Sequence, residues 1–455
     1  MPVVPSSLDE LLFLFAGAFS APSFETFRML VVGFVCRVGE HSVCGMLLGA
    51  RLERSWHHSR AHGFFAYRQW CPDRLGLLLL GFLVARFVPA DLPVKLAVDD
   101  SLFSRTGKQV HGAAWQYDGS ASSGHGPKIG YGNNFVIVTV IVRLPFMRRA
   151  VSLPVLSRLW RPDPDAKADR ENGVRRRKPN PAYPSKPVLA RELLDLIAAR
   201  FPDREIWLAG DSAYGTSAFR GLPERVMLTS RLKSNAKLYA PKPERTGKRG
   251  RPAKKGERLP RLARIADDPA TSWQQAEVLR SGKHQTMVVH RFEALFYDVW
   301  GERPVQVVLV RDPKRTSGYD IAIVTMNMRA TPAQIIESYD ERWSIEVAIE
   351  DAKQITGVGQ ARNRVKLAVE RTVPFGLLCQ SLTICWYALN GQAEQDVAHR
   401  RKRARWYTQK RHPSYQDMLS SLRREMIAAQ YLPVTGRTVN PPQISQPAPA
   451  INTAA

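Results

Sequence analysis

Two short apolar runs in this 455-residue chain each end in an aspartate. Residues 94–98 lead into Asp99 and Asp100, and residues 205–210 lead into Asp211. Apolar runs of this length, bounded by polar residues, are typical of strands buried in a sheet. A charge at the end of a buried strand is costly unless something compensates it. Each aspartate is therefore either an ordinary turn or capping residue or part of a site.

Strand and helix patterns alternate along the middle of the chain. The β-branched run 134–142 and the run 226–230 predict two more buried strands. Residues 188–201 have the spacing of an amphipathic helix. This alternation indicates a mixed α/β domain whose sheet is mainly parallel at its centre.

Changes in composition divide the chain into five segments. Residues 1–92 have helical periodicity and predict a helical domain, which either binds DNA or is an ordinary bundle with a basic outer surface. Residues 93–233 and 329–432 are expected to form two parts of one α/β core, the second with added C-terminal helices. Residues 234–328 predict a β-rich insertion, and the proline-rich residues 433–455 predict a disordered tail. Within the insertion, strands are expected at residues 286–290, 294–299 and 305–310.

The charge balance is strongly basic, with 66 lysines and arginines against 41 acidic residues and a formal net charge of +25. This excess favours a polyanionic partner, most often nucleic acid, although adhesion to ribosomes or membranes gives the same sum. Basic residues concentrate in the loop 245–252, which includes Lys248, Arg249 and Arg251, and in residues 399–411. Both segments are candidates for phosphate contacts, and the alternative for each is a solvated surface.

The cysteines and apolar segments bear on the compartment. Five cysteines form neither a CxxC pair nor a zinc spacing with histidine, which favours a reduced, cytoplasmic protein. The apolar segment 75–84 is too short for a membrane span and predicts a buried helix. The N-terminus lacks the pattern of a secretory signal, and we expect no membrane partner.

A polar stripe in the last third of the chain is the strongest functional signal. Residues 338–353 predict a helix on which Tyr339, Arg342, Glu346 and Lys353 are separated by three, four and seven residues. At 3.6 residues per turn, these steps keep all four side chains on one narrow face. A carboxylate beside an arginine, a lysine and a tyrosine suits a metal and a phosphate together.

The residues beside this stripe predict how the helix is packed. Apolar residues flank the stripe on both sides: Ile336, Trp343 and Val347 on one, Ile345, Ile349 and Ala352 on the other. Surface helices have one apolar face and one broad polar face. A thin polar strip between two apolar flanks instead predicts a mostly buried helix that lines a cleft. Glu350 falls near the strip and is a rival carboxylate.

Three carboxylates from separate elements can hold two divalent cations about 3.5–4 Å apart. Ligation by oxygen alone suits Mg²⁺ or Mn²⁺ rather than zinc. Because adjacent strand residues point to opposite faces, Asp99 and Asp100 are not both expected to reach one metal pair. Chemistry alone does not choose between them.

The order aspartate, aspartate, glutamate resembles the DDE transposases, specifically the bacterial insertion-sequence enzymes with a Y-(2)-R-(3)-E-(6)-K motif. The four stripe residues match that motif at every position. The segment 98–101, followed by Lys108, Gly112 and Gln116-Tyr117, is similar to the first block of these families, and residues 209–215 resemble the second. In the first block the ligand is commonly the aspartate of an Asp-x-Ser/Thr pattern, which favours Asp99; serine at position 101 stands where threonine is usual.

The resemblance implies a ribonuclease-H-like mixed sheet with a β-rich insertion before the glutamate helix. It implies that Asp99, Asp211 and Glu346 are catalytic and ligate two Mg²⁺ or Mn²⁺ ions. Arg342 and Lys353 would hold DNA phosphates, supported by Tyr339. The expected activity is metal-dependent cleavage at the element's terminal inverted repeats and strand transfer into target DNA, by a homodimer in the bacterial cytoplasm at the nucleoid.

Other residues are weaker candidates for DNA contacts. The sequence 248–252 resembles the core of an AT-hook, a short minor-groove binder. Trp273 and Trp300 in the insertion are candidates for stacking on an unpaired base of a hairpin intermediate, and the alternative for each is the core. The rival functions are a transposase-derived DNA-binding protein without activity and a nuclease on the same core that lacks strand transfer.

Overall fold

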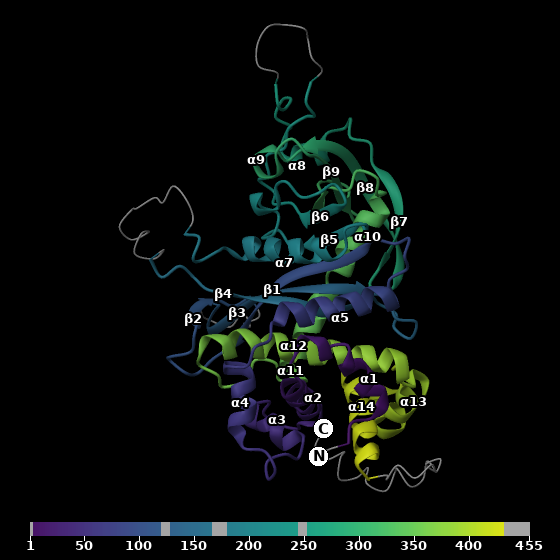
Figure 1. Ribbon diagram of the computed structural model, residues 1–455. Helices are drawn as coiled ribbons and strands as arrows, with labels where there is room; N and C mark the ends of the chain where they lie inside the picture. The colour runs from purple at the N-terminus through teal and green to yellow at the C-terminus, as the bar shows by residue number, and fades with distance from the viewer. Residues whose placement is uncertain (1–2, 120–127, 166–179, 244–252, 432–455) are drawn as a thin grey trace.

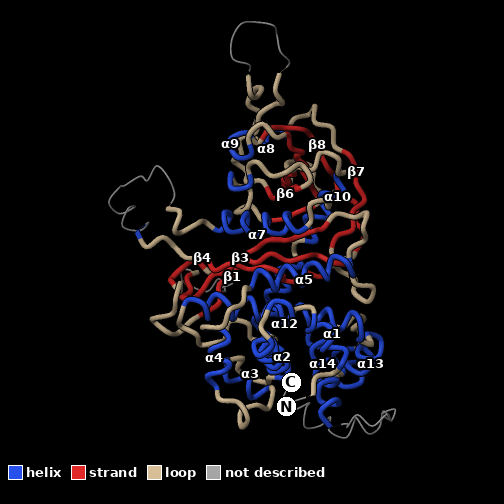
Figure 2. The backbone as a smooth tube through the Cα atoms, viewed as in Figure 1, coloured by secondary structure: helices blue, strands red, loops and turns tan. Residues whose placement is uncertain are grey.

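The computed structural model describes residues 3–119, 128–165, 180–243 and 253–431. One large sheet crosses its α/β half, and helices fill the other half (Figures 1 and 2). The strands are β1 (Val94–Ser104), β2 (Ala114–Tyr117), β3 (Ile129–Val142), β4 (Val151–Trp160), β5 (Ile206–Gly210), β6 (Val226–Arg231), β7 (Gln274–Arg280), β8 (Lys283–Leu295), β9 (Pro304–Arg311) and β10 (Ile321–Thr325).

The helices gather before, between and after these strands. They are α1 (Ser6–Phe13), α2 (Ala21–Cys36), α3 (Val43–Gly49), α4 (His58–Ala66), α5 (Pro72–Phe87), α7 (Lys186–Arg200), α8 (Leu262–Asp267), α9 (Tyr297–Trp300), α10 (Pro332–Glu341), α11 (Ser344–Gln354), α12 (Lys366–Asn390), α13 (Ala393–Arg403) and α14 (Tyr415–Tyr431), with short 3₁₀ turns η1 (Ala16–Ala18), η2 (Ser217–Phe219) and η3 (Arg405–Tyr407).

The sheet is mixed, and its strand order is β2-β3-β1-β5-β6-β10-β9-β8-β7, with β4 also paired to β3. Only β1, β5 and β6 run parallel to one another. The pairs on both sides of these three strands are antiparallel. A parallel centre was therefore predicted correctly, but it is confined to three strands and most of the sheet is antiparallel.

The β-rich insertion continues the same sheet, because β10 pairs with β6. A second apolar cluster lies between β7–β10 and α10 and includes Val278, Val308 and Ile335. The strand predicted at 294–299 is wrong in its second half, where the chain forms the single-turn helix α9. That turn brings Phe296 and Trp300 into edge contact, with ring centroids 5.5 Å apart, and buries both rings.

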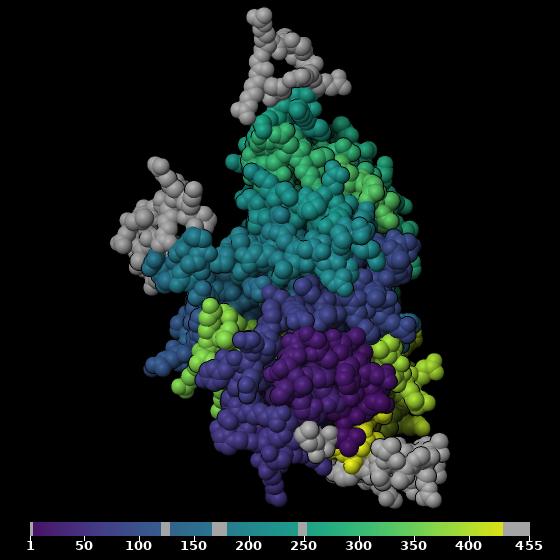
Figure 3. Space-filling view, in the orientation of Figure 1, coloured from purple at the N-terminus to yellow at the C-terminus, as the bar shows by residue number. Residues whose placement is uncertain are grey.

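The N-terminal helices pack against the C-terminal ones rather than apart from them. In Figure 3 the N-terminal helices (purple) lie next to the C-terminal ones (yellow-green) in the lower half. Helix α12 runs through their shared core and contacts α1, α2, α4, α5 and α14. Its Arg371 donates to the backbone carbonyls of Phe65, Arg68 and Trp70 at 2.7–3.1 Å. These bonds satisfy a buried guanidinium with carbonyls of the N-terminal segment.

Two apolar helices bear on the question of a membrane. The segment predicted as a buried helix lies in α5, where Leu75, Leu79 and Leu83 are all buried. Among the described residues, α12 alone is long and apolar enough to cross a membrane by length and composition, and 83% of its most apolar window is buried inside the protein. Packing in the core accounts for that apolar character.

Candidate active site

Strand register places the two predicted aspartates next to each other. β1 and β5 are parallel, and their ladder ends where Val98 lies opposite Gly210. Asp99 and Asp211 are the next residues on these strands, which are spaced about 4.8 Å apart. β1 does not end at Asp99 and Asp100 as predicted; it runs on to residue 104 because it continues to pair with β3.

The neighbouring aspartates of β1 point to opposite faces of the sheet. Asp99 faces α11, with its Oδ2 3.6 Å from Nη1 of Arg342. Asp100 faces α7, where its Oδ2 lies 2.6 Å from Nζ of Lys186. The hydroxyl of Tyr214 also donates to Asp100, at 3.3 Å. Asp100 therefore has its own partners on the other side of the sheet.

Helix α10 starts with strong capping chemistry. The Thr331 side chain accepts from the backbone N–H of Gln334, and the Gln334 side chain accepts from the N–H of Thr331. Pro332 follows in the first turn, where its missing N–H costs nothing. The capping residues thus determine where α10 begins, and the spacing from that start determines the face on which Tyr339 lies.

The single helix predicted over 338–353 is in fact two. α10 ends at Glu341 and α11 begins at Ser344. In the joint, the backbone N–H of Trp343 bonds to the carbonyl three residues earlier, at 3.0 Å, instead of four. This tighter turn leaves Arg342 in the joint, between the helix that carries Tyr339 and the helix that carries Glu346.

The two flanks of the stripe differ in burial. The buried flank residues are Ile336, Ile345, Ile349 and Ala352. Trp343 and Val347 are exposed, so the expectation of two buried flanks is wrong for these residues. Glu350 is exposed and accepts from Gln354 at 3.1 Å, away from the other carboxylates.

Arg342 connects the elements of the site. Its Nη2 donates to Oε1 of Glu346 at 2.9 Å, its Nη1 pairs with Asp99, and its guanidinium lies 5.5 Å from the Tyr339 ring centroid. The side chain is only 8% exposed. Burial alone would lower the pKa of Arg342, but the charges of Tyr339, Glu346 and Asp99 together raise it. Arg342 therefore stays cationic between two carboxylates.

Asp99 has the most perturbed carboxyl of the site. Burial raises the pKa of Asp99 to about 7, and the charges of Asp100 and Asp211 add to the rise. The N–H of Asp100, which donates to Asp99 at 2.8 Å, and the charge of Arg342 oppose the rise without cancelling it. A carboxyl of this kind gains from any added cation, because a nearby positive charge favours the ionised form.

The carboxylate donors fit a hard divalent cation, since all are oxygen ligands. In the described part of the chain, no three His, Cys, Asp or Glu side chains are grouped closely enough to hold a metal ion in this conformation. The guanidinium of Arg342 lies between Asp99 and Glu346 and takes the place of a cation there. A metal ion bound between Asp99 and Glu346 would take the position of this guanidinium.

Lys353, the last residue of the stripe, lies at the far end of α11. Its Nζ is 5.5 Å from the ring centroid of Phe103 on β1. Burial lowers the pKa of Lys353, and the nearby charge of Asp118 partly opposes this. Lys353 thus marks the end of the site toward the β2–β3 hairpin.

Sequence reasoning missed Glu341, which holds the joint in place. Its carboxylate is almost fully buried and pairs with Nζ of Lys95 at 2.7 Å and Nη2 of Arg143 at 2.5 Å. These two cations come from β1 and from the residue after β3. The signal was present in the sequence, as a glutamate next to Arg342, but its partners lie about 200 to 250 residues earlier in the chain.

A basic cavity of about 400 Å³ opens next to Tyr339 and Arg342. Arg149, Arg231 and Arg280 contribute to its lining. They come from three separate segments, so no local pattern could have grouped them. Asp340 also lines the cavity and pairs with Arg280 at 3.2 Å, so Arg149 and Arg231 are the lining cations that suit an anion.

Several predicted DNA-contacting residues lie away from the site or beyond what the structure describes. Lys248, Arg249 and Arg251 fall outside the described residues. Trp300 is buried, and its Nε1 donates to a backbone carbonyl at 3.1 Å, so it belongs to the core. Trp273 is half-buried beneath a guanidinium group 3.9 Å from its ring. The predicted tail, 433–455, is likewise outside the described residues.

Comparison with known proteins supplies the family. The family model of the DDE superfamily endonucleases matches residues 15–292, more than half of the chain. The chain belongs to the DDE superfamily endonucleases. No curated protein matches it.

Membership in the DDE superfamily implies DNA as the substrate and divalent-metal chemistry in this endonuclease. The matched range includes Asp99 and Asp211, and it ends before the helix that carries Glu346. In this endonuclease, the assignment of Glu346 as the third acidic residue is therefore supported by the motif and by the geometry, and not by the family match. The assignments of individual catalytic residues remain predictions.

Proposed function

We propose that this DDE endonuclease is a transposase of the insertion-sequence group with the Y-(2)-R-(3)-E-(6)-K motif. It cuts DNA at the ends of its element and joins the freed ends to target DNA. The observation that carries the proposal is the bridge made by Arg342, which pairs with Asp99 on β1 and Glu346 on α11. Asp211 supports the proposal because it directly follows Gly210 of β5, which lies opposite Val98, the residue before Asp99.

The strand order supports a ribonuclease-H-like core for this proposal. In β4-β3-β1-β5-β6, the first three strands pair antiparallel and the last three pair parallel. The glutamate helix returns to this core after the inserted strands β7–β10. In this arrangement the proposed ligands come from the central strand, its parallel neighbour and the returning helix.

Two Mg²⁺ or Mn²⁺ ions held by Asp99, Asp211 and Glu346 would activate the attacking water or 3′-hydroxyl and stabilise the leaving oxygen. Arg342, once released from the carboxylates, is positioned to hold a phosphate oxygen beside them, as its fork of donors allows. Tyr339 supports the guanidinium from α10. Lys353 holds a phosphate of the same strand at the far end of α11.

The proposed partners follow from the same chemistry. A net charge of +25 favours binding to phosphates of the terminal repeats and the target. Two element ends that are processed together require two active sites, so we propose a homodimer in the DNA complex. The low number of cysteines is consistent with a cytoplasmic, nucleoid-associated protein and no membrane partner.

The proposal is tested with Mg²⁺ and DNA that carries the element's own ends, taken from the sequence flanking the gene. Joined products support a transposase, cleavage without joining supports a nuclease on the same core, and binding alone supports an inactive descendant. Glu346→Gln is expected to abolish cleavage and joining while DNA binding persists. The matched control is Glu350→Gln, on the same helix but exposed, which should retain activity. Full strand transfer by Asp211→Asn would overturn the assignment.

A further inference from the structure

The β2–β3 hairpin presents large apolar side chains to solvent. Trp115 lies opposite Tyr131, and Tyr117 lies opposite Ile129, so all four side chains share one face of the hairpin. Trp115 is 73% exposed, Tyr117 69% and Ile129 52%. The rings of Trp115 and Tyr131 are in contact, with centroids 5.5 Å apart. These four residues are called the aromatic face below.

The opposite face of the hairpin carries small or polar residues. Gly130 lies there opposite Gln116, and a Cβ on Gly130 would come within 2.6 Å of Cδ2 of Leu102. A larger residue at position 130 would have to displace the end of the Leu102 side chain. On this hairpin, the face with Gly130 therefore lies against Leu102, and the face with the aromatic rings is exposed to solvent. An exposed cluster of this kind indicates a binding surface.

The aromatic face continues the sheet face that carries Asp99. Phe103 of β1 lies opposite Asn133, and Tyr131 is two residues before Asn133 on β3. Side chains two residues apart in a strand share a face, and Asp99 is four residues before Phe103. Asp99 and Tyr131 are therefore on the same side of the sheet, the side on which α11 packs.

The distance along the sheet fits a DNA strand. Asp99 lies opposite Ile137, which is six residues from Tyr131, or roughly 20 Å at about 3.4 Å per residue. A DNA strand that keeps the stacked spacing of the duplex advances by about 3.4 Å per nucleotide. The aromatic face is thus about six to eight nucleotides from a phosphate held at Asp99.

Cations accompany this path. Lys353 lies over Phe103, between Asp99 and the hairpin. At the base of the hairpin, the charges of Glu370, Arg161 and Lys366 all act on His111, so cations outnumber the single carboxylate there. Aromatic rings set among cations are the pattern that binds single-stranded nucleic acid, because bases stack on the rings while phosphates contact the cations.

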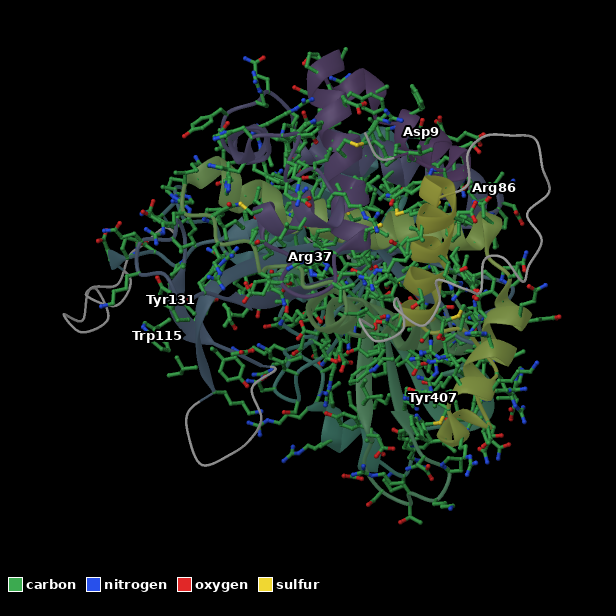
Figure 4. The ribbon with its side chains drawn as sticks, turned by 90° about the horizontal axis from the view of Figure 1, so that it is seen from below. Asp9, Arg37, Arg86, Trp115, Tyr131 and Tyr407 are labelled. Carbon is green, nitrogen blue, oxygen red and sulfur yellow. The ribbon has the colours of Figure 1, made fainter. Side chains whose placement is uncertain are left out.

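Figure 4 shows Trp115 and Tyr131 together at one edge of the molecule, well away from Tyr407. We propose that the aromatic face stacks unpaired bases of the DNA strand that leaves the active site, about six to eight nucleotides from the cut phosphate. The inference rests on the proposed function, because it takes the active site to be at Asp99.

The test uses the full-length Asp211→Asn protein without divalent metal, so that DNA is bound but not cut. The probes are fluorescent oligonucleotides of one element end whose terminal strand is unpaired, with a single abasic position moved along it. Loss of a base six to eight nucleotides from the cut should weaken binding at least about fivefold, and loss elsewhere should have a smaller effect. Trp115→Ala should remove this position dependence, and Trp115→Phe should largely keep it.

The matched control is Trp406→Ala. Trp406 is 79% exposed and lies next to Tyr407, with ring centroids 6.2 Å apart, on the distant surface. This variant should keep the position dependence. An abasic effect that is equal at all positions, that persists in Trp115→Ala, or that is as strong in fully paired DNA would overturn the inference. If wild type cleaves and joins ends while the abasic profile is flat, only the aromatic face is wrong. If wild type neither binds nor cuts the ends, the proposed function itself fails.

Discussion

Each face of strand β1 carries an aspartate that pairs with a cation, but the two ion pairs differ in how close they are. On the α7 face, Asp100 pairs closely with Lys186 and accepts from Tyr214. On the α11 face, Asp99 has a longer contact of 3.6 Å with Arg342. Two adjacent residues of one strand thus differ in their partners: Asp100 has a close ion pair, whereas the ion pair of Asp99 is longer.

The α11 face of β1 is recognisable from buried polar groups that lack hydrogen-bond partners. Nε and Nη1 of Arg342 are buried and have no hydrogen-bond partner, and the pKa of Asp99 is raised to about 7. Perturbed pKa values of this kind cluster at functional sites. The comparison teaches that a carboxylate with complete partners, such as Asp100, stabilises the fold, whereas one with incomplete partners is available for a ligand.

The largest expected difference between the faces is in activity. Asp99→Asn should reduce cleavage of element ends at least about 100-fold, because a ligand to the catalytic cation is lost. Asp100→Asn should retain most activity and lower the free energy of unfolding by about 1–2 kcal/mol, because its ion pair with Lys186 is broken. Cleavage rates and chemical denaturation measure the two effects. Equal loss of cleavage in both variants would break the comparison.

The next largest effect is the pH dependence of stability without metal. The pKa of Asp99 is about 7 in the folded protein and about 3.9 in the unfolded chain. Between these values the folded state holds the extra proton, so the free energy of unfolding should fall by a few kcal/mol as pH rises from about 4 to about 7. Asp99→Asn should lack this contribution, and urea denaturation across that range measures it. A slope unchanged by the substitution would contradict the raised pKa.

The residues involved show how much of this was predictable. Local chemistry revealed the strand before Asp99, the helical character of residues 338–353 and the spacing of the four stripe residues. The break at Arg342 was not predictable, because it depends on how the elements pack around it. The opposite faces of Asp99 and Asp100 followed from strand alternation, but which face receives α11 depends on tertiary packing.

A smaller effect is expected from the anchor of the joint. Glu341→Gln should lower the free energy of unfolding by about 1–3 kcal/mol, because the buried carboxylate pairs with Lys95 and Arg143. Both cations are partly exposed, which limits the loss. Thermal or urea unfolding measures it, and Glu350→Gln is the control, with an expected change within about 0.5 kcal/mol. If Glu341→Gln instead leaves stability intact, the α10–α11 joint is held by its apolar contacts alone.

The smallest effect compares the starts of the two helices that cover the faces. The Ser344 hydroxyl of α11 donates to the carbonyl of Glu341 at 2.7 Å and contacts the Ser152 hydroxyl at 2.6 Å. Ser185, which precedes α7, makes no capping bond with its side chain. Ser344→Ala should therefore cost about 1 kcal/mol of unfolding free energy and Ser185→Ala less than about 0.5. Because the Ser344 bond fixes the first turn of α11, Ser344→Ala should also weaken Mg²⁺ binding measured by calorimetry, which Ser185→Ala should leave unchanged. Equal Mg²⁺ affinities in the two variants would mean that the start of α11 does not control the position of Glu346.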